Sequence, residues 1–140
     1  MKISLIQINP IVGDLSYNKE KILKNYFISI KNNCDLVIFP EMSITGYPIS
    51  DLIYEDGFID ENIRVLEEIV LDTTIPIIIG YISKVGDKLY NSLAVCCEGG
   101  KIYQYDKILL PNYDVFDEKR YFSNGEDLGI WKMNYKGKKI

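Results

Sequence analysis

The 140-residue sequence contains no histidine. A Ser-His or Cys-His nucleophile pair, a zinc site with histidine ligands and a histidine proton shuttle are therefore excluded within this chain. Acid–base chemistry must come from carboxylates, lysines, tyrosines or thiols. Only three cysteines occur, Cys34, Cys96 and Cys97, which are too few for a disulfide framework and are typical of a reducing compartment.

Positive charge and long apolar runs are scarce as well. Sixteen Lys and Arg residues stand against twenty Asp and Glu residues, which gives a net charge of -4. This balance argues against binding to nucleic acid or to an anionic membrane, because no basic stripe is available to neutralise phosphates. No apolar run approaches the roughly 18 residues of a membrane span, and the N-terminal residues lack a signal peptide's apolar stretch. We therefore expect a soluble, cytoplasmic protein.

What is present predicts one folded domain that begins with alternating strands and helices. The 47% hydrophobic and 26% charged residues are ordinary for a globular protein of this length. Short apolar runs predict buried strands over residues 2–9, 35–39 and 75–83. One-sided apolar spacing predicts a helix from a cap at Asp14 or Ser16 to about residue 31, and another over residues 58–72. The order β-α-β-α-β predicts an α/β fold with a parallel sheet and right-handed crossovers.

The next part of the chain carries hairpin signals. Gly86-Asp87 and Gly99-Gly100 separate strand-like runs over residues 75–83, 88–97 and 101–109, which predicts an antiparallel meander. Residues 111–126 lack any periodicity and predict a long loop, a kind of segment that often carries function in compact domains.

The C-terminal residues predict one more hairpin. Residues 127–133 are typical of a strand, residues 135–137 of a turn, and Lys138-Lys139-Ile140 of the start of a following strand. A hairpin that stops there leaves a sheet edge unpaired. The pattern indicates one continuous domain that is cut off partway.

One carboxylate is a candidate for catalysis. Glu41 comes directly after the strand that ends at Phe39-Pro40, and ligands of open α/β sheets bind at the carboxyl ends of strands. A buried carboxylate at such a place binds a proton readily, which suits a general base. The alternative is a loop glutamate that caps a neighbouring helix.

A lysine is the second candidate. Lys107 follows the strand-like residues 101–106 and precedes the apolar Ile108-Leu109-Leu110. A partly buried ammonium needs an anionic partner, for which Glu41 is one candidate. Such a cation could stabilise a developing oxyanion. The alternative is a solvated lysine at the end of a strand.

The loop and the thiols are less decisive. Residues 111–122 mix aromatic side chains with charges of both signs, which fits either the wall of a polar pocket or a solvated turn. Cys96 and Cys97 lie within a strand and point to opposite sheet faces, and Cys34 lies between a helix and a strand. No basic residue adjoins them in the sequence to activate a thiolate. We therefore interpret the three thiols as structural.

Five strings, spread in order over almost the whole chain, match a known pattern. They are Gln7–Asp14, Asp35–Glu41, Thr45–Pro48 with Asp51-Leu52, Tyr90–Val95, and Lys107–Tyr113 followed by Val115–Phe122. In these strings the chain resembles the nitrilase, or carbon-nitrogen hydrolase, superfamily, and specifically the N-terminal glutaminase domain of glutamine-dependent NAD synthetases. Phe-Pro-Glu alone would indicate only the superfamily, whereas the Gly-Tyr-Pro and Phe-Asp-Glu-Lys-Arg-Tyr-Phe strings are more specific.

The resemblance implies a Glu-Lys-Cys triad on an α-β-β-α sandwich. Glu41 would be the general base that deprotonates the catalytic thiol, and Lys107 would stabilise the tetrahedral oxyanion. Tyr47, Tyr113 and Glu118 match positions around the glutamine pocket. Glu118 would either hold the α-amino group of the substrate or orient the lysine. No metal and no cofactor is implied for this chain itself.

The resemblance also implies parts that this sequence does not contain. In the family the nucleophilic cysteine follows the next strand, whose beginning Lys138-Lys139-Ile140 matches. We therefore expect residues 1–140 to be a partial carbon-nitrogen hydrolase domain, a truncated sandwich without the nucleophile-bearing half. An ATP-dependent synthetase domain would also be absent. The parent enzyme would release ammonia from L-glutamine and amidate deamido-NAD with ATP and Mg²⁺, and it would be a homo-oligomer.

Two other readings stay open. One is a different amidase of the nitrilase superfamily that acts on a carbamoyl or ω-amide substrate. The other is a non-catalytic fragment that serves as an oligomerisation or binding module or is simply decayed. The sequence also departs from the family pattern at Ile49 and Ser50, and at Asp114, where a glycine is usual. If the backbone at Asp114 has a positive φ, aspartate tolerates it better than most residues.

Overall fold

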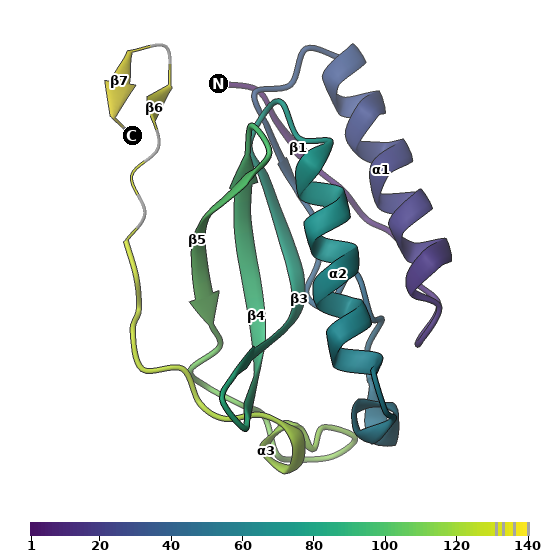
Figure 1. Cartoon of the computed structure of the whole chain (residues 1–140). Coiled ribbons are helices and arrows are strands. Elements are labelled where there is room, and N and C mark those ends of the chain that lie inside the picture. The colour runs from purple at the N-terminus through teal and green to yellow at the C-terminus, as the bar shows by residue number, and fades with distance from the viewer. Residues whose placement is uncertain (131, 133, 136, 140) are drawn as a thin grey trace.

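A mixed five-stranded sheet forms the centre of the protein (Figure 1), and the computed structural model describes residues 1–130, 132, 134, 135 and 137–139. In spatial order the strands are β1 (Ile3–Leu5), β2 (Leu36–Ile38), β3 (Ile77–Val85), β4 (Lys88–Cys97) and β5 (Gly100–Asp106). β1 pairs with β2 and β2 with β3 in parallel, whereas β3, β4 and β5 pair antiparallel. The predicted parallel start and antiparallel meander are both confirmed.

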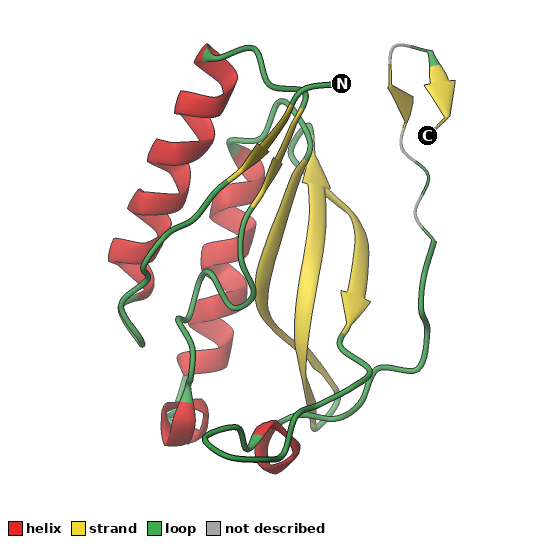
Figure 2. Cartoon of the chain, turned by 180° about the vertical axis from the view of Figure 1, so that it is seen from behind, coloured by secondary structure: helices red, strands yellow, loops and turns green. Residues whose placement is uncertain are grey.

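Two helices cover one face of this sheet (Figure 2). They are α1 (Leu15–Lys31) and α2 (Phe58–Leu71), within a residue of the predicted bounds. Asp14 caps α1, because its side chain accepts a hydrogen bond from the Tyr17 backbone N–H at 3.0 Å. The helical spacing places Ile22 and Tyr26 of α1 in the core together with Val65 and Ile69 of α2.

The first strand is shorter than residues 2–9, the predicted range. Its ladder ends with the bond from the Ile6 N–H to the Ile38 carbonyl. Beyond that point the chain bonds to α1 and no longer to β2. The Ile11 N–H donates to Asn18 Oδ1 of α1, and Asn18 Nδ2 donates to the Ile11 carbonyl. Side-chain hydrogen bonds of this kind compete with sheet pairing, and periodicity does not reveal them.

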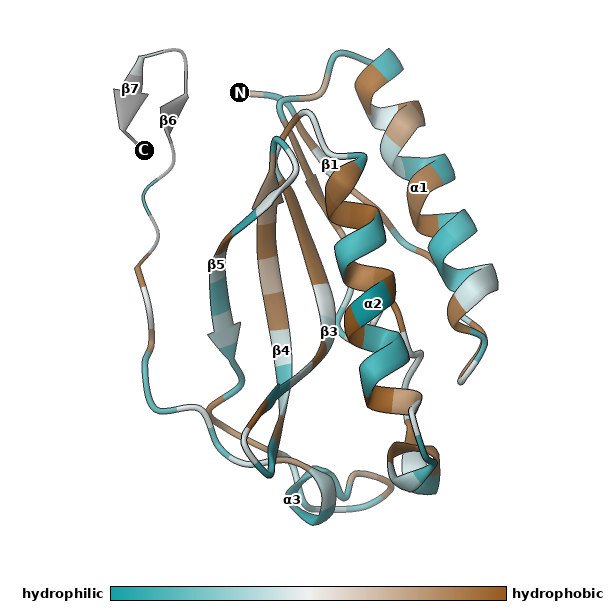
Figure 3. Ribbon diagram, in the orientation of Figure 1, coloured by the Kyte–Doolittle hydropathy of each residue, from teal (hydrophilic) through white to brown (hydrophobic). Residues whose placement is uncertain are grey.

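The opposite face of the sheet carries no helix among the described residues. The Ser4 hydroxyl bonds to Ser29 of α1 and therefore points to the helices, so Ile3 and Leu5 point the other way. Ile3 is 44% and Leu5 75% exposed. Strands β3 and β4 are hydrophobic over most of their length (Figure 3). The described part is thus one helix layer and one sheet, half of the α-β-β-α sandwich that the resemblance implies.

Several predictions for the connections and the C-terminal residues were incomplete or wrong. The structure adds a 3₁₀ helix, η1 (Ser50–Tyr54), before α2. It also adds a short helix, α3 (Glu118–Tyr121), inside residues 111–126, the segment predicted as a loop. Residues 127–130 and 132 are not in a strand. The Asp127 side chain accepts a hydrogen bond from the Gly129 N–H, a local bond of the kind that competes with strand pairing.

The final strands are β6 (Asn134–Tyr135) and β7 (Lys138–Lys139), which pair with each other. The hairpin prediction is therefore confirmed in part. Lys138-Lys139 forms a strand as predicted, whereas its partner is Asn134–Tyr135 and not residues 127–133, and Tyr135 lies in that strand and not in the predicted turn. The parts of this prediction at residues 133, 136 and 140 lie outside the described residues. None of the described helices has the length and apolar content that crossing a membrane requires.

Tyr26 ties α1 to the start of β3. Its ring is fully buried. Its hydroxyl donates to the Ile75 carbonyl and accepts from the N–H groups of Thr74 and Ile75, at 2.8–2.9 Å. The substitution Tyr26→Phe keeps the ring and leaves these three backbone groups without that partner. We predict a loss of about 1–3 kcal/mol in the free energy of unfolding, measured by urea titration.

The control for this prediction is Tyr17→Phe on the same helix. Tyr17 is 40% exposed, and its hydroxyl contacts only the Lys21 ammonium among its described partners. That variant should change the free energy of unfolding by less than about 0.5 kcal/mol. Equal losses for the two variants would contradict the account of Tyr26.

Candidate active site

Glu41 lies in a tight loop that rests on the middle of β3. Met42 and Ile44, which follow it, are fully buried and anchor the loop. A Cβ atom added at Gly80 of β3 would lie 2.3 Å from the Met42 nitrogen and 2.6 Å from the Pro40 carbonyl oxygen. Only glycine lets the loop approach the strand this closely. The position of Glu41 therefore depends on a residue 39 positions further along the chain.

Lys107 follows β5 directly, and its backbone is held on both sides. Its N–H donates to the Asn91 carbonyl of β4, and its own carbonyl accepts from the Gly125 N–H, both at 2.9 Å. The Lys107 ammonium then reaches Glu41 Oε1 at 2.7 Å and Glu118 Oε1 at 2.9 Å. The two candidates, Glu41 and Lys107, are thus in contact. The alternative of a solvated lysine at the end of a strand is wrong, because Lys107 bonds to two carboxylates.

Glu118 is the buried acid of this group. Its side chain is only 4% exposed. Oε1 accepts from the Lys107 ammonium and from the Tyr47 hydroxyl at 3.0 Å. Oε2 is buried and has no hydrogen-bond partner among the described residues. One oxygen of Glu118 therefore orients Lys107, and the other remains available to a donor from outside the described chain.

The surroundings fix the protonation of the donors. Burial by itself would lower the pKa of Lys107, but the hydrogen bonds and charges of Glu41 and Glu118 outweigh it and raise that pKa above the ordinary lysine value. Burial and the bond to Glu118 raise the pKa of Tyr47 well above that of a free tyrosine. At neutral pH the site therefore holds one ammonium and one protonated phenol against two carboxyl groups.

Two expectations for Glu41 require correction. Its side chain is 47% exposed, so it is not the buried carboxylate that its place after a strand suggests. Glu118 is buried instead. The hydrogen bonds of Glu41 go to Asn91 and Lys107 and not to a helix terminus, so the capping alternative is wrong.

Tyr47 and Tyr113 have different places. Tyr47 contacts Glu118 directly, whereas Tyr113 is 69% exposed. The Phe116 ring stands between them, 6.2 Å from the Tyr47 ring and 5.6 Å from the Tyr113 ring. The structure thus brings Tyr47 to the charged group and leaves Tyr113 at its rim. The backbone at Asp114 has a φ of 54°, the positive value that we considered because a glycine is usual at this position in the family.

Two cavities adjoin the charged residues. One of about 260 Å³ lies on the helix-free face and is lined by Glu41, Lys107 and apolar residues of β2, β3 and β4. The other, of about 170 Å³, is lined by Tyr47, Glu118 and Tyr121. The loop of residues 111–122 therefore forms part of a polar pocket wall, as one of its two readings predicted.

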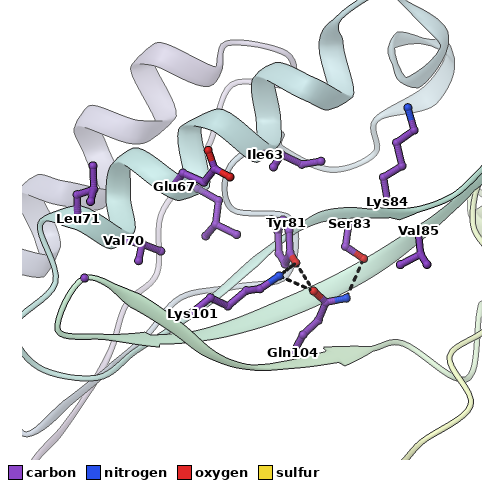
Figure 4. A pocket seen from close by; sticks show the side chains of 12 residues that line it. Ile63, Glu67, Val70, Leu71, Tyr81, Ser83, Lys84, Val85, Lys101 and Gln104 are labelled. Atoms are coloured by element: carbon purple, nitrogen blue, oxygen red, sulfur yellow. Dashed lines mark hydrogen bonds between the residues drawn. The ribbon is translucent and has the colours of Figure 1, made fainter.

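A larger cavity of about 630 Å³ lies elsewhere, between α2 and β3–β5 on the helix-bearing face (Figure 4). It contains neither Glu41 nor Lys107. Four of its polar side chains form a network, in which Lys101 and Tyr81 both donate to Gln104 Oε1 and Gln104 donates to Ser83. Because this cavity holds neither member of the Glu41–Lys107 pair, the candidate active site is the one around Lys107.

The three thiols lie away from this site. Cys97 is six residues from Asn91 along β4, about 20 Å at the rise of a strand. Cys34 precedes the first residue of β2, at the end of that strand opposite to Glu41. Cys96 is fully buried, and burial raises its pKa to about 11. The structural role predicted for these residues agrees with these positions. The described residues also contain no cluster of side chains that could hold a metal ion.

The sequence comparisons agree with this geometry. Residues 2–137 match the family described as carbon-nitrogen hydrolase. The chain belongs to the carbon-nitrogen hydrolase family. Among curated proteins, the glutamine-dependent NAD(+) synthetase of Thermotoga maritima is 36% identical over 136 residues, which cover 95% of this chain and 23% of that protein. The corresponding protein of Aquifex aeolicus is 38% identical over 137 residues, with 96% and 24% covered.

Solved structures of carbon-nitrogen hydrolases share the fold. The glutamine-dependent NAD+ synthetase from Acinetobacter baumannii aligns with a TM-score of 0.89 and 32% identity, over 98% of this chain and 26% of that one. An amidase of the nitrilase superfamily from Nesterenkonia aligns with a TM-score of 0.84 over 99% of this chain and 53% of that one. At 20% identity the amidase supports the fold alone. The chain spans about a quarter of the length of the curated relatives named above.

Sequence reasoning missed three residues that build this site. Gly80 sits in an apolar run with nothing to mark it, and Phe116 was only one aromatic of a loop. Asn91 lies inside one of the strings that match the family, but it was assigned no role. Its place between the apolar Leu89 and Leu93 on one strand face was a usable signal, because a polar residue buried there needs a hydrogen-bond partner.

The contact at Gly80 yields a prediction. The substitution Gly80→Ala forces the backbone of residues 40–42 away from β3, because the added methyl group has no space. We expect a loss of about 1–3 kcal/mol in the free energy of unfolding, measured by urea titration.

Gly100→Ala in β5 is the matched control. Its Cβ would meet only the Cys97 carbonyl oxygen at 3.8 Å, an ordinary contact. This variant should stay within about 0.5 kcal/mol of the wild type. If Gly80→Ala were equally harmless, the loop of Glu41 would not rest on the strand as described.

Proposed function

We propose that this chain supplies the base, the cation and part of the substrate pocket of a glutaminase site in a glutamine-dependent NAD+ synthetase. The observation that carries the proposal is the Lys107 ammonium, 2.7 Å from Glu41 and 2.9 Å from Glu118. The names of the relatives with 36–38% identity support glutamine as the amide donor. A carboxylate base with a fixed ammonium also accords with the absence of histidine.

In the proposed reaction, Glu41 takes the proton of a thiol, and the thiolate attacks the side-chain amide carbon of glutamine. Lys107 stabilises the negative oxygen of the tetrahedral intermediate. Ammonia leaves with the returned proton, and water then cleaves the γ-glutamyl thioester to glutamate. The thiol comes from a segment other than those of Cys34, Cys96 and Cys97, which lie away from the site.

Tyr47, Tyr113 and Glu118 hold the substrate in this proposal. The orphan Oε2 of Glu118 supports a contact with a substrate N–H, while Oε1 orients Lys107. These two roles, the alternatives left open by the sequence, therefore belong to different oxygens of one carboxylate. Tyr113 at the rim contacts the outer part of the substrate.

The whole parent protein has further proposed properties. Its synthetase domain uses the released ammonia to amidate adenylated deamido-NAD, with ATP and Mg²⁺ bound in that domain and no cofactor in this chain. It acts in the cytoplasm as a homo-oligomer. These proposals rest on the resemblance and on the relatives, of which this chain covers 23–24%.

A chimera tests the proposed function. This chain is fused in place of the matched 136-residue segment of the Thermotoga maritima relative, so that the relative supplies the remaining parts. We predict that the chimera forms glutamate from glutamine in preference to other ω-amides. Glu41→Gln and Lys107→Met should each lower kcat/KM by roughly 10³-fold, because each removes one chemical role.

Lys119→Met, on the exposed side of the short helix α3, is the control and should retain activity. The 140-residue chain alone should form no glutamate. Turnover by the chain alone, or full activity of the Glu41 and Lys107 variants in a folded chimera, would overturn the assignment. A chimera that prefers a carbamoyl substrate would favour a different amidase.

A further inference from the structure

Asn91 of β4 contacts both charged residues of the candidate active site. It is 3% exposed. Its side-chain Nδ2 donates to Glu41 Oε1, and its backbone carbonyl accepts the Lys107 N–H at 2.9 Å. Burying an amide is costly unless it is hydrogen-bonded, and the Asn91 amide is bonded to the Glu41 carboxylate. One strand residue thus joins the loop of Glu41 to the end of β5.

The two oxygens of Glu41 have different surroundings. Oε1 receives the Asn91 amide and the Lys107 ammonium. Among the described residues no donor reaches Oε2. Because the side chain is 47% exposed, packing alone does not fix it. The two donors therefore decide which oxygen of Glu41 is occupied and which remains able to take a proton.

We infer that Asn91 is the positioning residue of the proposed base: it holds Oε1 of Glu41 so that Oε2 takes the proton of the attacking thiol. This inference rests on the proposed function. An amide suits the task better than a charged group, because Nδ2 donates without adding a second cation beside Lys107. With Oε1 occupied by two donors, the proton from sulfur moves to Oε2, and the carboxylate becomes a neutral acid there.

If Asn91 had a purely structural role, its removal would have a different effect. In that case Asn91 would only tie β4 to the neighbouring loop, and its removal would cost stability without changing the chemistry. Asn62 of α2 provides the matched comparison. It is also fully buried, and its side chain bonds to the backbone of Ile82, the residue opposite Asn91 in the sheet. Removing Asn62 weakens the same part of the sheet and leaves Glu41 untouched.

The first test uses the 140-residue chain and needs no activity. The side-chain amide protons of Asn91 are followed by ¹⁵N-correlated NMR while the pH is lowered. We expect one Asn91 amide resonance to move as Glu41 is protonated, and to stay fixed in the Glu41→Gln variant. The amides of Asn18 and Asn62, which donate to backbone carbonyls, serve as internal controls. If the Asn91 amide resonances do not respond to the protonation of Glu41, the inference is overturned, whatever reaction the protein catalyses.

The second test uses the active chimera with Thermotoga maritima. Asn91→Ala should lower kcat on the order of 100-fold with KM little changed, because it misplaces the base and not the substrate. Asn91→Asp, which keeps the shape but sets a carboxylate against Glu41, should be at least as impaired and should shift the pH profile of kcat. Asn62→Ala should lower thermal stability and leave kcat and its pH profile unchanged.

The outcomes separate the two proposals. If kcat of Asn91→Ala stays within about threefold of the parent chimera, the positioning role is wrong even though the glutaminase assignment stands. If the parent chimera is folded and inactive, the proposed function fails, and the NMR titration still decides whether Asn91 holds Glu41. If Asn62→Ala loses as much kcat as Asn91→Ala, the effect of Asn91 is structural and the inference is overturned.

Discussion

An ammonium held between two carboxylates organises one end of this molecule. Lys107 bonds to Glu41, which lies in a loop 66 residues away in the sequence, and to Glu118, the first residue of α3, which is 11 residues away. Glu118 is almost completely buried, and a buried carboxylate is costly unless it is paired and hydrogen-bonded. Lys107 and Tyr47 meet that requirement. The separate segments that carry these groups therefore have to converge on one point.

Close backbone contacts make this convergence possible. Gly80 lets the loop of Glu41 lie directly on β3, and a Cβ at Gly125 would fall 2.0 Å from the Asp106 carbonyl oxygen, next to Lys107. Asn91 links the same two segments through one side-chain and one backbone hydrogen bond. The sheet thus supports the functional groups, which stand on short segments held closely against it. This arrangement restricts the freedom of the charged side chains before any substrate binds.

Much of this platform was predictable from the sequence, because apolar periodicity reports burial directly. The helices α1 and α2, the three-strand meander and the pairing of Glu41 with Lys107 follow from local pattern and from the need of a partly buried cation for an anion. The predictions failed where side chains bond to backbone, as when Asn18 bonds to Ile11 beyond the short first strand and Asp127 bonds to Gly129 within the segment predicted as a strand. They also failed where spatial neighbours decide, because the exposure of Glu41 and the burial of Glu118 depend on packing between distant segments. Gly80 was not recognisable for the same reason.

The titration of Lys107 tests the central claim most directly. The Lys107 side chain can be followed by ¹³C NMR at its Cε atom through the alkaline range, in the wild type and in the Glu118→Gln variant. We predict a Lys107 pKa above the ordinary lysine value, because the bonds to Glu41 and Glu118 outweigh the effect of burial, and a lower Lys107 pKa in the variant. A Lys107 pKa at or below the ordinary value, unchanged by Glu118→Gln, would show that the ammonium is not held between the two carboxylates.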